Sequence, residues 1–182
     1  MTRPPLPFPL PLPFPLTSPK PFPRFYLSLA AVVAGLGATT IAGAAGSVEV
    51  KFIDPANYTD TGLHAWDRER ALQDLQAHLL ALGSRLPDGQ TLRIEVLDVD
   101  LAGEIRYGTG QDWRVLRGGV DWPQMRLRYT LQAGGQTLAQ GEERLSDPAY
   151  LFSHRLVHKY SFLPYERRML DDWFGQRFPS LR

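Results

Sequence analysis

Asp98 and Asp100 are the residues whose type and spacing come closest to a chemical site in this chain. They continue the alternation of a strand that we expect from Leu92 to about Leu101. On one face of a β-strand, residues two apart are separated by roughly 7 Å, because each residue rises about 3.3 Å. Two carboxylates at that separation could hold a cation, or could share the acid and base roles of a metal- or carboxylate-assisted hydrolase acting on an envelope component.

Two less reactive interpretations of the same aspartates are the commoner ones in proteins, and we favour them. A β-bulge near Leu97 would shift the alternation by one residue, so that Val99 rather than Asp98 faces the core. The carboxylates could then accept hydrogen bonds from arginines in the segment that follows, as a structural latch. The arginines within reach are Arg106, Arg114 and Arg117.

The segment from Glu104 to Trp122 is rich in Gly, Arg and aromatic residues. Trp, Tyr and Arg are the usual anchors of protein interfaces. We therefore expect this segment, with a short strand at Trp113–Leu116, to be the contact surface of a non-catalytic binding or envelope-assembly module. The candidate binding residues are Asp98, Asp100, Arg106, Trp113, Arg114, Arg117 and Trp122.

Motifs of established catalytic families are missing from the sequence. It has no nucleophile elbow, Walker loop, dinucleotide-binding Gly motif or Ser-His-Asp order. His154 and His158 would share one face of a helix expected at Ser153–Tyr160, but the intervening Glu of a zinc-protease helix is lacking. We expect both to be partly exposed, and His64 and His78 to lie at the surface or its boundary. No metal, cofactor or catalytic residue is therefore assigned.

Hydrophobic periodicity predicts the elements that must position these residues. Leucines at steps of three and four give one helix a buried face, and Met169, Leu170, Trp173 and Phe174 do so for another. The expected elements are a strand at Val48–Ile53, a helix from an N-cap at Asp67 to about Arg85, the strand at Leu92–Leu101, a hairpin around Gly134-Gly135, and a helix beginning at Pro164. This order predicts an α+β fold, a mainly antiparallel sheet with two helices packed on one face.

Local chemistry predicts several pairings in the second half of the chain. Gly134-Gly135 supplies the positive φ angles of a two-residue hairpin turn. That turn would pair Leu131 with Leu138, and Arg126 with Glu143. On the last helix we expect ion pairs four residues apart, between Arg167 and Asp171 and between Arg168 and Asp172.

The N-terminal residues have the layout of a secretory signal peptide. Residues 1–24 form a Pro-rich extension, interpreted as a long n-region or a misassigned start, with only basic charges. An apolar segment over 25–45 follows and ends in small residues, with cleavage expected near Ala44 or Ala45. It is too short and too rich in Ala and Gly for a spanning helix, although an uncleaved anchor is the alternative. We expect residues 46–182 to be one periplasmic or secreted domain with no stable membrane span.

Charge and cysteine content exclude several classes of function. The chain has 20 Lys and Arg against 19 Asp and Glu, and three of the basic residues precede residue 25. The remainder has 17 basic against 19 acidic side chains, a net charge of −2 that gives no electrostatic basis for binding nucleic acid. Because there is no Cys, disulfides, thiolate metal sites and lipid attachment through a cysteine are excluded.

Four ordered sequence strings give the chain a family resemblance. They are VEVKFIDP at 48–55, DVDLAGE at 98–104, GEERLSD at 141–147 and YERRMLDDW at 165–173. Together they resemble a proteobacterial family of exported proteins, the domain of unknown function 3016. The resemblance implies a single secreted or periplasmic domain and carries over no activity, ligand or catalytic residue. The expected partner is an unknown protein or envelope component.

Overall fold

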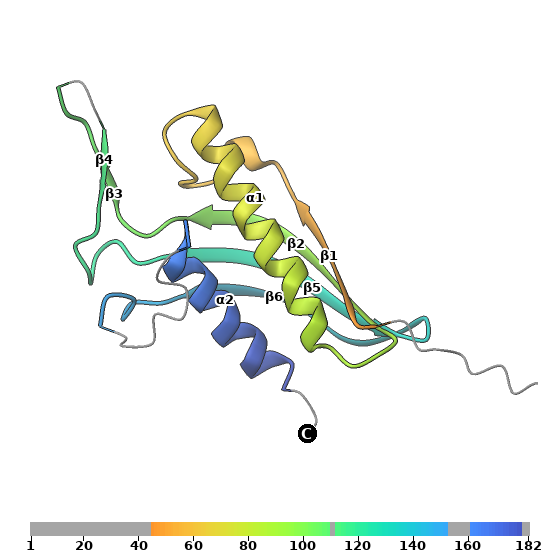
Figure 1. Ribbon diagram of the computed structural model, residues 1–182. Coiled ribbons are helices and arrows are strands. Elements are labelled where there is room, and N and C mark those ends of the chain that lie inside the picture. The colour runs from red at the N-terminus through yellow and green to blue at the C-terminus, as the bar shows by residue number, and fades with distance from the viewer. Residues whose placement is uncertain (1–44, 110–111, 153–160, 180–182) are drawn as a thin grey trace, which may run out of the picture. The chain divides into compact units, whose positions relative to one another are not determined.

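A computed structural model describes residues 45–109, 112–152 and 161–179 (Figure 1). In chain order the elements are β1 (Ser47–Phe52), the 3₁₀ turn η1 (Pro55–Asn57), α1 (Ala65–Ala81), the 3₁₀ turn η2 (Leu82–Arg85), β2 (Gln90–Asp100), β3 (Glu104–Arg106), β4 (Trp113–Val115), β5 (Gln124–Ala133), β6 (Gln136–Ser146) and α2 (Pro164–Arg177). The predicted leader and Ala44 lie outside the described residues, and Ala45 is the first residue within them. The helix expected at 153–160, with His154 and His158, also lies outside them.

Four strands form the main sheet in the order β1-β2-β5-β6. β1 runs parallel to β2, and the β2–β5 and β5–β6 pairs are antiparallel. β3 and β4 pair separately as a two-stranded antiparallel hairpin. Both helices cover the same face of the main sheet (Figure 1). This arrangement confirms the predicted α+β class.

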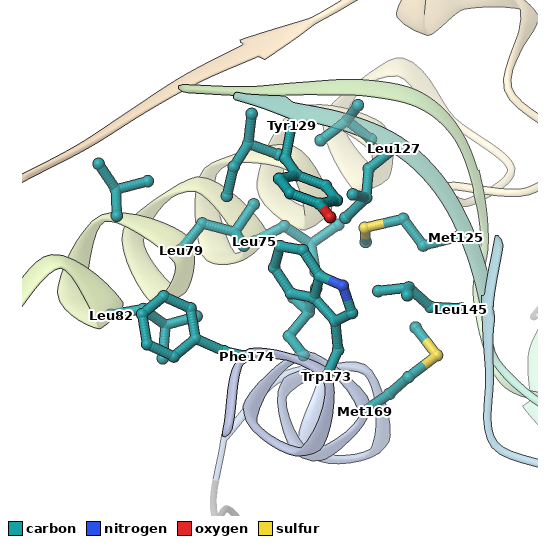
Figure 2. Close-up of a cluster of buried hydrophobic side chains, with 14 of the residues drawn as sticks. Leu75, Leu79, Leu82, Met125, Leu127, Tyr129, Leu145, Met169, Trp173 and Phe174 are labelled. Carbon is teal, nitrogen blue, oxygen red and sulfur yellow. The ribbon is translucent and has the colours of Figure 1, made fainter. Parts of the chain in front are cut away.

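The core lies between that sheet face and the two helices (Figure 2). Leu75 and Leu79 of α1 are fully buried, and so is Phe174 of α2 to within 1%. They meet alternate side chains of the sheet, which present an apolar row because successive strand residues point to opposite faces. The sheet residues buried there include Leu92, Ile94, Val96, Met125, Leu127, Tyr129 and Leu145. The apolar stripe predicted for the last helix is confirmed.

A bulge at Leu97 resolves the position of the two aspartates on β2. Val96 pairs with Leu127 and Asp98 with Arg126, so Leu97 is the extra residue between them. The alternation restarts after the bulge, and Val99 is fully buried. The favoured interpretation of this strand is confirmed, and both carboxylates lie off the core face.

The β5–β6 hairpin departs from the register that its turn predicts. Gly134 and Gly135 both adopt positive φ, at 55° and 78°, as the turn requires. Leu131, however, pairs with Ala139, because Leu138 bulges out of β6 and is 53% exposed. From that bulge onward every pair shifts by one residue. The two predicted pairs, Leu131 with Leu138 and Arg126 with Glu143, are therefore wrong, and Arg126 pairs with Arg144.

The first helix begins three residues earlier than predicted. Its N-cap is His64, and Asp67 stands at the third helical position, where its Oδ2 accepts a hydrogen bond from the His64 backbone N–H at 3.2 Å. Asp67 as N-cap is therefore wrong, although the acidic side chain still satisfies the helix start. His78 also differs from expectation, because it is buried at 8% exposure with Nε2 3.4 Å from Asp171 Oδ1.

The arginines of α2 reach across the fold rather than along their own helix. Arg167 forms an ion pair with Asp74 of α1, and Arg168 with Asp147 after β6. Arg168 also donates to the carbonyl of Tyr150 at 3.1 Å. The predicted pairs with Asp171 and Asp172 are therefore wrong. Because α2 packs between α1 and the end of β6, its arginines find partners there.

Candidate functional site

The Glu104–Trp122 segment lies next to the main sheet as the β3–β4 hairpin and the loop that follows it (Figure 1). Ile105 pairs with Arg114 at the centre of the hairpin, and Arg106 pairs with Trp113. The short strand at Trp113 is confirmed, ending at Val115, whereas its partner β3 has only three residues and too little alternation to be predicted. Such a short pair needs other contacts to hold it in place.

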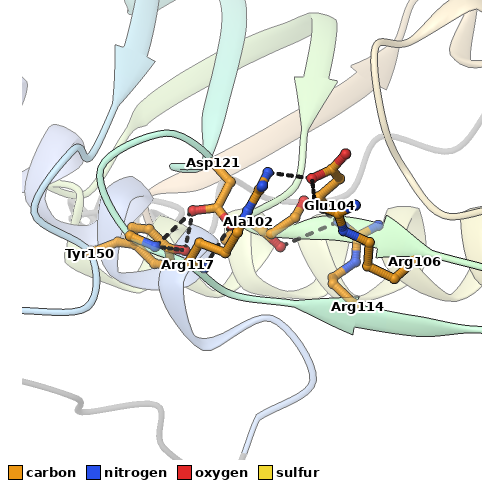
Figure 3. Close-up of polar contacts among 9 residues, drawn as sticks. Ala102, Glu104, Arg106, Arg114, Arg117, Asp121 and Tyr150 are labelled. Atoms are coloured by element: carbon orange, nitrogen blue, oxygen red, sulfur yellow. Dashed lines mark hydrogen bonds and ion pairs between the residues drawn. The ribbon is translucent and has the colours of Figure 1, made fainter.

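Arg114 supplies the largest set of those contacts. Its guanidinium forms a bidentate ion pair with Asp60, at 2.8 Å from Nη1 to Oδ2 and 3.0 Å from Nη2 to Oδ1. Nη1 also donates to the carbonyls of Gly103 at 3.0 Å and Ala102 at 3.3 Å. The Ala102 N–H in turn donates to the buried carboxylate of Glu166 on α2, at 2.8 Å. Figure 3 shows Arg114 beside Ala102. The hairpin is thus connected to both α2 and the loop before α1.

Burial raises the pKa of Glu166, and the Ala102 hydrogen bond opposes that shift only in part. The carboxyl group is 3% exposed at the start of α2. Its position near the helix N-terminus favours the charged form, which eases but does not remove the cost of desolvation.

Asp121 closes the loop after the hairpin. Its carboxylate accepts the Arg117 N–H at 2.7 Å, the Gly118 N–H at 2.9 Å and the Tyr150 hydroxyl at 2.7 Å (Figure 3). Burial alone would raise the pKa of Asp121, but these hydrogen bonds together hold it below its ordinary value. Burial and the hydrogen bond that the Tyr150 hydroxyl donates to Asp121 raise the pKa of Tyr150 to about 12. Arg117 adds an ion pair to Glu104, so the loop is fixed at both ends.

A cavity of about 650 Å³ lies between the hairpin and the start of α1, and we call it the aromatic cavity. Trp66 and His64 come from the helix start, Trp113 from β4 and Phe162 from the turn before α2. Trp66 is 63% exposed and Trp113 is 52% exposed. The remaining lining includes Leu63, Leu101, Ile105, Leu163, Asp67, Asp112 and Arg114. Its volume is that of a small-ligand pocket, and its walls are aromatic with a few charged groups.

A second cavity, of about 680 Å³, lies along the same hairpin, and we call it the polar cavity. Asp60, Asp100, Glu104, Arg117 and Trp122 are among its lining residues. Burial raises the pKa of Asp100, and the nearby charges of Asp60 and Asp98 raise it further. In the part of the chain that the structure describes, no group of three or more His, Asp or Glu side chains is arranged to hold a metal ion.

Asp98 is held by a loop rather than by arginine. Its Oδ1 accepts the Thr59 N–H and its Oδ2 accepts the Thr59 hydroxyl, both at 2.8 Å. These bonds join β2 to the loop that follows η1. The expected latch therefore exists, but the predicted arginine partners are wrong for this residue, and Arg114 binds Asp60 instead.

Comparison with known families identifies the chain. The family described as "Protein of unknown function (DUF3016)" matches residues 46–176. The chain belongs to this family. No curated protein and no solved structure matches it. The function of this DUF3016 domain must therefore be inferred from the site itself.

The residues predicted for the site divide between the two cavities of the DUF3016 domain. Trp113 and Arg114 line the aromatic cavity. Asp100, Arg117 and Trp122 line the polar cavity. Asp98 lines neither of these two cavities. Arg106 forms a surface ion pair with Glu104 at 3.1 Å.

Sequence reasoning missed the other half of the aromatic cavity. Trp66 precedes the apolar stripe of α1 and does not fit its period. An aromatic residue that lies off the buried face of a helix is a signal of a binding surface, and this signal was present in the sequence. Phe162 and Asp67 gave no signal, because only the fold brings them to the hairpin. Among residues 45–109, 112–152 and 161–179, no helix has both the length and the hydropathy needed to cross a bilayer.

Proposed function

We propose that this chain is an exported, non-catalytic binding module whose contact surface is the Glu104–Trp122 segment with its two cavities. One observation carries the proposal: Trp113 is exposed in a cavity wall, while the residue beside it, Arg114, is held by Asp60 and by two neighbouring backbone carbonyls. A fixed hairpin that presents an exposed indole pays little entropy on binding.

The exposed apolar side chains of the described residues support this choice of surface. Tyr107 is 76% exposed, Val120 is 68% exposed and Trp66 is 63% exposed. All three belong to the hairpin segment or to the cavity walls beside it. Soluble proteins seldom gather large apolar side chains in one place unless the surface meets a partner or ligand.

Export is the second part of the proposal. Its support is the sequence of the leader, with basic residues, an apolar segment and small residues up to Ala45. The partner would then be a protein or another component of the envelope or the medium. Mass spectrometry of the mature N-terminus tests this directly. Cleavage near Ala44 or Ala45 is expected, and a protein that keeps Met1 in the cytosol would contradict it.

A comparison of captured partners tests the binding surface. Wild type, Trp113→Ala and Arg117→Ala are used as baits against envelope extract, with Leu138→Ala as the matched control. Leu138 is an equally exposed apolar residue at the β5–β6 turn, outside the Glu104–Trp122 segment that contains the β3–β4 hairpin. We expect the two hairpin variants to lose partners that the control retains. Identical profiles for all four proteins would remove the segment as the contact surface.

The second candidate function is a carboxylate- or metal-assisted hydrolase, and Asp100 is the observation that favours it. A carboxyl group with a raised pKa that lines a cavity is a common feature of acid–base sites. Asp60 and Asp98 both interact with it, although Arg114 holds Asp60 and Thr59 holds Asp98. Calorimetric titration of a chelator-treated sample with calcium, magnesium, manganese and zinc tests the metal version. Absence of heat with all four would end it.

A further inference from the structure

We infer that the aromatic cavity binds an organic cation, an ammonium or guanidinium group on a short apolar stem. This inference rests on the proposed binding function and names the ligand chemistry of the same surface. It follows from two properties of the walls: exposed aromatic faces, and carboxylates that form no ion pair with the residues that the structure describes.

The aromatic faces come from three separate parts of the chain. Trp66 stacks against His64 at a centroid distance of 6.1 Å and an interplanar angle of 19°, which leaves the indole 63% exposed. Trp113 on β4 and Phe162 before α2 line the same cavity. An aromatic ring attracts a cation through the negative potential over its face, and Trp does so most strongly.

Phe162 already interacts with a cation that lies outside the cavity lining. The guanidinium carbon of Arg70 lies 4.1 Å from the ring centroid of Phe162. This contact is within the range of cation–π pairing, so Arg70 competes with a ligand for this ring, and the inference depends on the faces of Trp66 and Trp113. Because Arg70 comes from the next turn of α1 and does not line the cavity, the faces of Trp66 and Trp113 stay accessible.

The charged groups in the walls give a negative balance. Asp67 and Asp112 line the cavity, and within the described residues neither forms an ion pair. Arg114 is the cation in the lining, and Asp60 neutralises it in a bidentate pair. Two carboxylates beside aromatic faces would repel an anion and would gain from an incoming cation.

Other ligand chemistries fit these walls less well. A purely apolar ligand would gain nothing from Asp67 and Asp112. A neutral saccharide could also stack on the indole faces and use the donors of Thr61 and His64, but it would gain nothing from the negative charge of Asp67 and Asp112.

Titration with matched pairs of ligands tests the inference. Choline is compared with its neutral isostere 3,3-dimethylbutan-1-ol, and the N-acetyl methylamides of lysine and arginine are compared with that of norleucine. The first pair represents a free small cation, and the second represents a cationic side chain of a protein partner. Heat and quenching of Trp emission are the readouts. We expect each cation to bind at least about tenfold more tightly than its neutral partner, and added salt to weaken binding.

Variants of the wall residues test the aromatic faces and the negative charge separately. Trp113→Leu keeps apolar contact but removes the ring, and Asp112→Asn keeps the shape but removes the charge. Each is expected to weaken cation binding by about two- to thirty-fold. Leu138→Ala, outside the cavity, should bind as wild type does. Thermal unfolding of all four proteins shows whether any loss of binding reflects loss of folding.

Equal binding of the cations and their neutral isosteres would overturn the inference, as would saturable binding of a neutral oligosaccharide that Trp113→Leu abolishes. No binding of any cation up to about 10 mM would do the same. These failures differ from failure of the proposed function. If partner capture still depends on Trp113 while no cation binds, the surface stands and only the ligand chemistry is wrong.

Discussion

Arg114 and Asp60 form a two-point ion pair that joins β4 to the loop before α1. The pair lies at the junction of both cavities, because Arg114 lines the aromatic cavity and Asp60 lines the polar cavity. Both side chains are about three-quarters buried, at 27% and 22% exposure. The hairpin has only three residues in each strand, so this pair decides how firmly Trp113 is presented.

Substitution of Arg114 should therefore weaken both stability and binding. Arg114→Ala leaves Asp60 and two carbonyls without their donor and should lower the free energy of unfolding by about 2–4 kcal/mol. Arg114→Lys keeps the charge but cannot bind both oxygens, and should cost about 1 kcal/mol. Urea unfolding measures both values.

A double-mutant cycle with Asp60→Asn isolates the pair from its surroundings. We expect a coupling energy of about 1–2 kcal/mol between positions 60 and 114, because the two side chains contact each other directly. Additive effects would show that the carbonyls of Ala102 and Gly103, rather than Asp60, hold the guanidinium.

Removal of the exposed indoles should weaken binding while leaving stability nearly unchanged. Trp113→Ala and Trp66→Ala each remove a side chain that is more than half exposed. Because little apolar area is buried in either case, the free energy of unfolding should change by less than about 1 kcal/mol. Binding of a cation or partner should nevertheless fall. Unfolding midpoints measured beside the titrations distinguish this result, and a large loss of stability would make both residues structural.

The two aspartates of β2 should respond differently to substitution. Asp98→Ala loses the bonds from the Thr59 N–H and hydroxyl and should destabilise the fold by about 1–3 kcal/mol. Asp100→Asn should leave stability at pH 7 unchanged or increase it, because the raised pKa of Asp100 means that folding disfavours its charged form.

The sign of the pH effect for Asp100 follows from the same shift. Its pKa in the folded protein lies above the unfolded value, so the penalty exists above the folded pKa and disappears as the pH falls toward about 4. The advantage of Asp100→Asn over wild type should therefore shrink on acidification. Urea unfolding at pH 7 and pH 4.5 measures it, and an advantage that grows toward low pH would contradict the assignment.

The elements of this fold follow from local patterns, whereas the site depends on contacts that such patterns do not contain. Leu75 and Leu79 on α1, and Leu170 and Phe174 on α2, are each four residues apart, which is helical spacing, so their burial could be predicted. The β6 bulge could not, because the turn fixes register only next to itself and Leu138 carries no mark of an extra residue. The predicted Arg126–Glu143 pair is wrong for that reason.

The second limit on prediction from the sequence is the pairing of polar side chains that lie far apart in the chain. Arg114 and Asp60 are separated by 54 residues, and Arg167 and Asp74 by 93. An arginine can reach many carboxylates, and only the packing of the helices on the sheet selects one. The sequence did identify the Glu104–Trp122 segment through its composition, but it gave no indication that Trp66 would lie across a cavity from it.

The Asp121–Tyr150 contact should make the loop after the hairpin sensitive to acid. Asp121→Asn loses the charge that three donors share and should destabilise the protein by about 1–3 kcal/mol at pH 7. The lowered pKa of Asp121 stabilises the fold above the unfolded value near 4, and this contribution is lost as the pH falls through the folded pKa. The difference between wild type and Asp121→Asn should therefore narrow below about pH 4.

Tyr150→Phe is the matched control for that measurement. It removes one of the three donors but leaves the carboxylate and both backbone bonds, so its cost should be about 1 kcal/mol and smaller than that of Asp121→Asn. Without the Tyr150 hydroxyl the pKa of Asp121 should rise toward its ordinary value, so Tyr150→Phe should lose less free energy of unfolding on acidification than the wild type does. If the wild type and Tyr150→Phe lose the same free energy of unfolding between pH 7 and the acid range, the hydroxyl does not hold the carboxylate, and the backbone of Arg117 and Gly118 alone fixes the loop.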